Sequence, residues 1–237
     1  MSKRLFDNTK LAFELKSNNS LRKSLFLFNI IKYPLIVKLS SFLMRLFLKL
    51  KLPVTPIIKS LLFDQFCVGL NEKESMMTVK KLSKFNLKSI LHYHVEGYES
   101  EKSFDDCLAN TIKTIKSAAK TNNVPFTVFK PTGLGSLKLF HKIAQGSILN
   151  ENEKSQLERI EKRFDSCFQI CKKYCVKILI DSEESWIQPG VDLLVEKYMI
   201  KYNKDEALIY NTAQMYLKNK IKYLDHLLRL SKKKSFV

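Results

Sequence analysis

The chain has 237 residues, of which 45% are hydrophobic, and 41 Lys and Arg against 23 Asp and Glu give it a formal net charge of +18. This composition excludes an intrinsically disordered chain and provides enough apolar material for one large domain, or for one domain with an N-terminal extension. Because Lys greatly outnumbers Arg, and Lys reads phosphates and bases less specifically than Arg, we expect a solvated basic surface and no nucleic-acid partner.

Residues 21–62 form a conspicuously apolar segment near the N-terminus. Five basic residues between positions 32 and 51 interrupt it, so no uncharged run reaches the ~18 residues that a membrane-spanning helix needs. The spacing of Leu39, Leu43, Leu46 and Leu50 predicts an amphipathic helix with a cationic back, which ends before the prolines that follow. Packing on a neighbouring domain is the favoured interpretation, and contact with a membrane surface stays open as the alternative.

Four short runs beyond residue 87 have the character of β-strands, at positions 89–95, 126–130, 176–180 and 207–213. Helical stretches lie between them. Capping-box patterns, Ser103 with Asp106 and Asn150 with Glu153, predict where two of these helices begin. Alternation of strand and helix predicts an α/β fold with parallel strands and right-handed crossovers.

Five cysteines, an odd number without a recognisable secretory signal, favour a reducing compartment and a cytoplasmic location. Cys167, Cys171 and Cys175 recur every four residues and would form one stripe on a helix. No His or Cys pair is placed to complete a zinc site, so we interpret the stripe as part of a buried helix face and expect no metal.

Polar residues follow each of the four predicted strands. Glu96 follows the first, Lys130 the second, Asp181 and Ser182 the third, and Gln214 the fourth. In α/β folds with parallel strands the chemistry lies at the carboxyl ends of the strands, where the loops converge. These residues therefore predict the rim of an active site.

The motifs "SILHYHVEG", "FKPTGLGS", "ILIDSEESWIQP" and "LIYNTAQMYLKN" resemble, in this order, the successive strand motifs of the proline dehydrogenase family. Members of that family are flavoenzymes built on a (β/α)8 barrel. The resemblance implies an N-terminal helical segment over residues 1–86 and a partial TIM-type barrel of about four strands over residues 87–237.

By resemblance, the activity is oxidation of L-proline to 1-pyrroline-5-carboxylate with hydride transfer to FAD, and a quinone is one candidate for the final electron acceptor. Lys130 would bind the substrate carboxylate, and Asp181 would be the acidic residue of the catalytic pocket. Ser182 and Gln214 would contact the flavin. Glu96 would belong to the substrate site, pairing with an arginine of the last helix.

Two neighbouring acids, Glu183 and Glu184, are expected to cap the helix that follows Asp181, since negative charge suits a helix N-terminus. The single tryptophan, Trp186, is expected in the core. One position departs from the family pattern, because His92 stands where the first strand usually has Asp.

The predicted strand starts lie about 39 residues apart on average, so eight strands would need more residues than the sequence provides. We therefore expect an incomplete barrel that binds FAD weakly or not at all by itself and that self-associates or pairs with a separate C-terminal half. Two alternatives are a non-catalytic fragment of the family that acts in binding or assembly, and a basic module for membrane surfaces.

Overall fold

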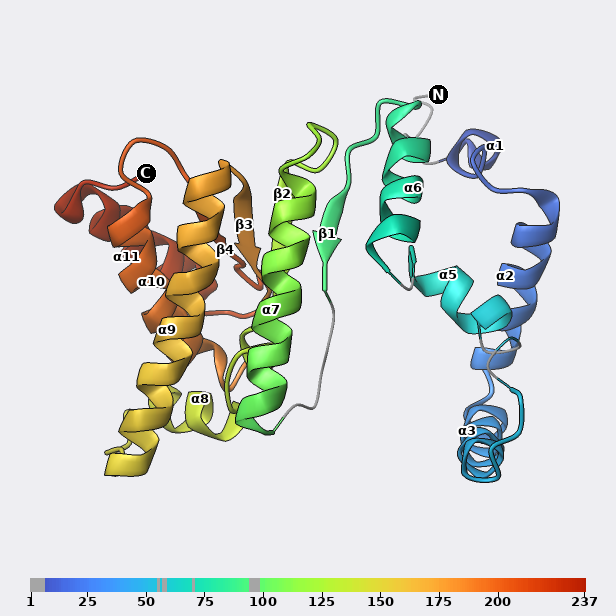
Figure 1. Ribbon diagram of the computed structural model, residues 1–237, viewed down its shortest axis with the longest axis horizontal. Coiled ribbons are helices and arrows are strands. Elements are labelled where there is room, and N and C mark those ends of the chain that lie inside the picture. Colours follow the sequence, from blue (N-terminus) through green and yellow to red (C-terminus); the bar gives the residue numbers. More distant parts are fainter. Residues whose placement is uncertain (1–6, 55, 57–58, 70, 94–98) are drawn as a thin grey trace. The chain divides into compact units, whose positions relative to one another are not determined.

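The structure is a computed structural model of the chain, and it describes residues 7–54, 56, 59–69, 71–93 and 99–237. By its contacts the chain divides into two compact units, Met1–Ser75 and Met76–Val237 (Figure 1). We call them the N-terminal unit and the sheet unit. The expected domain division between residues 86 and 87 stays a prediction.

The N-terminal unit is helical throughout its described secondary structure. Its elements are α1 (Thr9–Ala12), α2 (Asn18–Ile31), α3 (Pro34–Lys49), a π-helical turn (Lys59–Phe63), α5 (Asp64–Phe66) and the start of α6 (Glu72–Ser83). Ser17 caps α2 by accepting a hydrogen bond from the Ser20 amide at 3.2 Å. Pro34 occupies the start of α3, where its missing amide hydrogen is not needed. The predicted amphipathic helix is therefore α3, which ends before the prolines as expected.

Within the described part of the chain, no single helix is long and apolar enough to cross a membrane. Helices α2 and α3 satisfy the length and composition criteria only when taken as a pair, and the chain bends by 104° between them.

The sheet unit is built on four parallel strands in the order β1-β2-β3-β4 (Figure 1). They are β1 (Ile90–His92), β2 (Phe126–Phe129), β3 (Lys177–Ile180) and β4 (Ile209–Asn211). The intervening and following helices are α7 (Glu101–Ala118), α8 (Leu137–Ala144), α9 (Glu151–Tyr174), α10 (Gln188–Tyr202) and α11 (Lys220–Lys234). All four predicted strands are confirmed, and the strand order equals the chain order, as right-handed βα repeats require.

One face of the sheet forms the core with the helices. Burial alternates along β2 and β3, and five helix-facing side chains of the sheet are at most 1% exposed; they are Thr127, Phe129, Ile178, Ile180 and Ile209. Phe129 meets Phe164 of α9 edge-on, with ring centroids 5.0 Å apart. Burying side chains of this size contributes about 1.5–3 kcal/mol each, so this layer stabilises the sheet substantially.

The opposite face, which we call the inner face, is only half-buried. Phe126, Val128, Leu179 and Tyr210 lie on it. The rings of Phe126 and Tyr210 meet edge-on at 5.3 Å although β3 separates their strands, so side chains converge over this face. Among the described residues, helices thus cover the strands on one face only.

One of the two predicted helix starts is confirmed, and the other is wrong. At α9, Asn150 accepts from the Glu153 amide at 2.9 Å and the Glu153 carboxylate accepts from the Asn150 amide at 3.1 Å, which confirms the capping box. The start of α7 was predicted wrongly, because Ser100 is the cap and accepts from the Ser103 amide at 3.1 Å. Ser103 lies inside the helix.

The cysteine stripe lies on α9 and is buried for two of its three positions. Cys167 and Cys171 are fully buried in the core, and burial raises the pKa of the Cys171 thiol to about 12. Cys175 was placed on the same face but is exposed, because it ends the helix in a left-handed conformation with φ of 53°. Among the described residues, no three His, Cys, Asp or Glu side chains form a group that could hold a metal ion.

The entry into β4 is organised by the fully buried Asn203, at the end of α10. Its side-chain oxygen accepts from the amides of Leu208 (3.1 Å) and Ile209 (2.9 Å), and its side-chain nitrogen donates to the Ile209 carbonyl at 2.9 Å. One side chain thereby replaces the backbone partners that the loop lacks, and it fixes where β4 begins.

Candidate functional site

The predicted site residues of the second and third strands lie at the same level of the sheet. Phe129 pairs with Ile180, and the Asp181 amide donates to the Phe129 carbonyl at 3.1 Å, so the ladder extends one step beyond the strands. Lys130 and Asp181 occupy that next position. Because side chains alternate along a strand, both belong to the inner face, opposite the buried Phe129 and Ile180. The structure thus brings Lys130 and Asp181 onto adjacent positions of one face.

Beyond their last paired residues, β3 and β4 are held together by side chains that donate to backbone carbonyls. Thr212 Oγ1 donates to the Ile180 carbonyl at 2.8 Å, and Ser182 Oγ donates to the Thr212 carbonyl at 2.9 Å. Gln214 Nε2 donates to the Glu183 carbonyl at 2.8 Å. Ser182 and Gln214, predicted to contact a flavin, are therefore brought together at neighbouring strand ends.

The side-chain oxygen of Gln214 is an acceptor without a donor in the described part of the chain. Gln214 Oε1 is buried, and among the described residues it has no hydrogen-bond partner. A buried amide oxygen without a donor is costly, by about 1–3 kcal/mol, and such an atom in a native structure points to a missing donor. The carboxylate of Asp181 likewise makes no hydrogen bond or ion pair within the described part of the chain, and it is half-buried.

The side chain of Glu183 connects the loops after β2 and β3. Its carboxylate accepts two hydrogen bonds from Thr132, from the amide at 2.9 Å and from the hydroxyl at 2.6 Å. Thr132 lies in the short 3-10 turn Pro131–Gly133 that directly follows Lys130. Since the Glu183 carbonyl also accepts from Gln214, one residue ties together the ends of β2, β3 and β4. We call this set of contacts the Glu183 clamp.

Two predictions for the segment after β3 were wrong. Glu183 and Glu184 do not cap the next helix with their side chains, because α10 begins only at Gln188, with Pro189 in its first turn. Trp186 is 44% exposed and packs edge-on against the His141 ring at 4.7 Å, while Ile187 fills the core instead.

Glu96, predicted to belong to the substrate site, lies outside the described residues, so its role stays a prediction. Gly135, in the loop after β2, is required for close packing: a Cβ there would lie 2.4 Å from Ile160 Cδ1 of α9.

A buried ion pair stabilises the helices behind β4. The Asp192 carboxylate of α10 accepts from Lys220 Nζ at 2.9 Å, from Gln188 Nε2 at 2.7 Å and from Asn211 Nδ2 at 2.8 Å. The Gln188 side-chain oxygen accepts from the Glu183 amide at 3.3 Å, which connects this network to the Glu183 clamp. Sequence reasoning missed the pair because its partners are 28 residues apart and neither position carries a motif.

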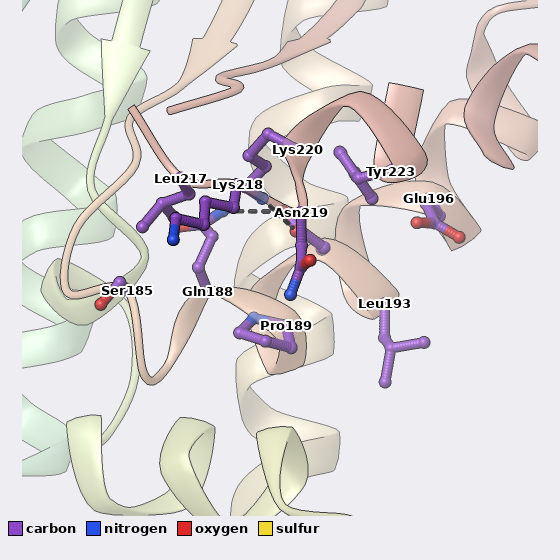
Figure 2. A pocket seen from close by; sticks show the side chains of 11 residues that line it. Ser185, Gln188, Pro189, Leu193, Glu196, Leu217, Lys218, Asn219, Lys220 and Tyr223 are labelled. Atoms are coloured by element: carbon purple, nitrogen blue, oxygen red, sulfur yellow. Dashed lines mark hydrogen bonds and ion pairs between the residues drawn. The ribbon is translucent and has the colours of Figure 1, made fainter. Parts of the chain in front are cut away.

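A pocket of about 560 Å³ opens beside this network, between α10 and the start of α11 (Figure 2). Its walls are formed by α10 and by the segment from Leu217 to Tyr223, and Asp192 and Lys220 are among its lining residues. None of the four predicted site residues that the structure describes lines it. Its buried charges, Asp192 and Lys220, pair with each other, so the strand ends on the inner face are the better candidate site.

Comparison with known proteins identifies the family. The family model for proline dehydrogenase matches residues 75–237. The chain is 35% identical over 153 residues to the carbapenem antibiotics biosynthesis protein CarD of Pectobacterium carotovorum, covering 65% of this chain and 41% of that protein. It is 31% identical over 232 residues to the mitochondrial proline dehydrogenase 1 of Dictyostelium discoideum, covering 81% of this chain and 41% of that protein. The chain therefore spans about two fifths of the length of these relatives.

Among solved structures, the sheet topology is similar to that of proline utilization A from Bdellovibrio bacteriovorus, with a TM-score of 0.59 at 14% identity over 71% of this chain and 18% of that chain. This similarity confirms the predicted partial (β/α)8 barrel. Because the family model covers all four strands and the helices that pack on them, the chain belongs to the proline dehydrogenase family.

Proposed function

We propose that this chain contributes to the FAD-dependent oxidation of L-proline to 1-pyrroline-5-carboxylate. In this reaction a hydride, one proton with two electrons, leaves the ring carbon that is bonded to the nitrogen but does not carry the carboxylate, and the nitrogen loses a proton as the C=N bond forms. The observation that carries the proposal is the position of Lys130 and Asp181 at adjacent strand ends on one face, within a chain that belongs to this family.

The two charged residues have complementary tasks toward proline. Lys130 provides a cation for the substrate carboxylate, and a charge pair of this kind is stronger in a site that excludes water than in bulk solvent. Asp181 provides a carboxylate toward the ring nitrogen, where positive charge develops as the hydride leaves. Placing both on one rigid sheet fixes the substrate between them, which reduces the entropic part of the barrier.

The residues at the ends of β3 and β4 suit a flavin. Gln214 Oε1 is a buried acceptor whose donor is missing among the described residues, and the pyrimidine edge of FAD carries an N–H group of the required kind. Ser182 and the Gln214 amide nitrogen already donate to backbone carbonyls and hold the loops in place. When bound, FAD would accept the hydride, and the electrons would then need a final acceptor, for which a quinone is one candidate.

A closed barrel of this type has eight strands, and the described residues supply four. We therefore propose that the catalytic unit also contains four further strands, carried either by a continuation of the polypeptide or by a second chain. With four strands alone we expect weak FAD binding, because half of the rim is absent.

The test is to purify the chain, alone and together with a polypeptide that carries the later strands of a relative, and to measure bound flavin and proline-dependent reduction of an artificial acceptor. Lys130→Met and Asp181→Asn should each abolish proline-dependent reduction. Lys177→Met is the matched control. Lys177 lies on the same face at the other end of β3, about 13 Å from Asp181 along the strand.

Equal loss of activity in the control and in Lys130→Met would contradict the proposed substrate site. A complex that never binds flavin, with proline or without it, would instead support a non-catalytic role in binding or assembly.

A further inference from the structure

Helix α3 carries an apolar surface that no described residue of its own unit covers. None of its residues is buried, and only Met44 and Phe47 are half-buried. Leu35, Leu39 and Phe42 are 81%, 59% and 64% exposed. An exposed apolar surface along a helix about 24 Å long is larger than isolated surface leucines account for, and it marks an interaction site.

The neighbouring helix explains why α3 remains uncovered. Helix α2 packs toward the π-helical turn and α5, where Ser24 Oγ donates to Gln65 Oε1 at 2.6 Å and Phe28 meets Phe66 edge-on at 6.4 Å. Leu27 of α2 is buried there. Because the chain bends by 104° after α2, α3 leaves that contact and presents most of its circumference to the surroundings.

The charges on α3 are arranged along one stripe. Lys38, Arg45 and Lys49 are spaced seven and four residues apart, so they lie on the same side of the helix, and all three are exposed. Leu35, Phe42 and Leu46 lie directly beside this stripe. Long basic side chains next to an apolar surface can extend their charged ends to the level of lipid headgroups while their stems stay in the apolar layer.

The sign of the charge is uniform well beyond α3. Residues 15–63 include nine Lys and Arg and no Asp or Glu. A second copy of this segment would meet it with like charges, and a nucleic acid would leave the leucines and phenylalanines exposed. An anionic bilayer satisfies both features at once, because it attracts the cations and takes up the apolar side chains.

We propose that α3 is a membrane-docking helix that lies in the headgroup layer of an anionic phospholipid bilayer. Its apolar surface enters the boundary of the acyl chains, and Lys38, Arg45 and Lys49 contact the lipid phosphates. The proposal does not depend on the proposed enzymatic function, and its test has no activity readout.

The test is co-sedimentation of the full chain with vesicles of phosphatidylcholine, with and without phosphatidylglycerol. The chain should sediment only with the anionic vesicles. Lys38→Gln/Arg45→Gln/Lys49→Gln should weaken binding on the order of 100-fold, because each basic residue near the surface contributes about fivefold. Leu39→Ser/Phe42→Ser should also release the chain, because the apolar contribution is lost.

The matched control is Leu224→Ser/Leu228→Ser on α11, another basic amphipathic helix with exposed leucines. It should bind vesicles like the parent chain. The proposal would be overturned if the α3 and α11 double variants lost vesicle binding equally, or if Leu39→Ser/Phe42→Ser left vesicle binding unchanged. If that α3 pair instead lowers the free energy of unfolding without vesicles, the apolar surface packs within the protein.

A fluorescence readout locates the helix directly. Trp186 is the only tryptophan, so Trp186→Phe with Phe42→Trp places a single reporter on α3. Its emission should shift to shorter wavelength on adding anionic vesicles, and lipids brominated on the acyl chains should quench it. An emission spectrum that anionic vesicles leave unchanged would refute insertion of this face.

Discussion

The Glu183 clamp makes a quantitative prediction about the rim of the barrel. In Glu183→Ala, the Thr132 amide and hydroxyl both lose their acceptor in a buried turn. Hydrogen bonds to a charged group contribute about 1.5–3 kcal/mol each, and a buried amide left without an acceptor costs about 1–3 kcal/mol. Since these terms overlap, we expect Glu183→Ala to lower the free energy of unfolding by about 3–5 kcal/mol.

Two further variants resolve this loss into its parts. Glu183→Gln should cost only about 1 kcal/mol, because its amide oxygen can accept from the Thr132 amide while its nitrogen donates to the Thr132 hydroxyl. Thr132→Val removes one of the two bonds and should cost about 1.5–3 kcal/mol. If the contact is direct, Glu183→Ala/Thr132→Val will cost about 1–2 kcal/mol less than the sum of the single variants.

The assay is urea unfolding of the full chain followed by circular dichroism. Glu184→Ala is the matched control, since Glu184 is the adjacent acid, is exposed, and makes no side-chain hydrogen bond or ion pair within the described residues. It should change stability by no more than about 0.5 kcal/mol. Equal effects of Glu183→Ala and Glu184→Ala, or strict additivity with Thr132→Val, would refute the clamp.

Three other predictions concern the sheet unit. Asn203→Asp should destabilise the protein by about 2–4 kcal/mol in urea unfolding, because a carboxylate oxygen replaces the donor to the carbonyl at the start of β4; a neutral result would contradict its role there. Gly190→Ala should lower the free energy of unfolding by about 1–3 kcal/mol, since a Cβ would lie 2.5 Å from the Phe140 carbonyl oxygen of α8. Unchanged stability would mean that α8 and α10 separate readily. The hydrogen bond from Arg159 lowers the pKa of Glu101. The stabilisation that this ion pair provides is therefore present above about pH 4.3 and is lost as the pH falls through the lower pKa of the folded state. Glu101→Gln should be less stable than the parent chain near neutral pH and equally stable in strong acid, and a difference that persists in acid would exclude this ion pair as the cause.

Local signals were sufficient for the sheet but not for the contacts between its loops. The apolar runs at Phe126–Phe129 and Lys177–Ile180 became strands because β-branched and aromatic residues flanked by turns leave few alternatives. The capping box at Asn150 was confirmed because all its partners lie within one turn. Glu183, by contrast, was interpreted as a helix cap because its true partner, Thr132, lies 51 residues earlier.

Errors at single residues have the same cause. Trp186 was expected in the core on grounds of size, yet the turn before α10 points the neighbouring Ile187 inward, and only the three-dimensional course of the loop decides between them. Ser103 and Ser100 are both good caps, and the helix uses the earlier one because α7 begins one turn earlier than its apolar pattern suggests.

The way in which the strand ends are closed explains why the Asp181 carboxylate remains available for a ligand. Where a parallel ladder stops, backbone carbonyls lose their partners and nearby side chains usually satisfy them. Here Ser182, Thr212 and Gln214 perform that task between β3 and β4, and each donates to a carbonyl. The Asp181 carboxylate cannot donate a hydrogen bond when ionised, so the same closure leaves it on the inner face, at the level of Lys130. The rim thus separates residues that hold the backbone from residues that present charge, and replacing a residue of the first kind should change stability before it changes ligand binding.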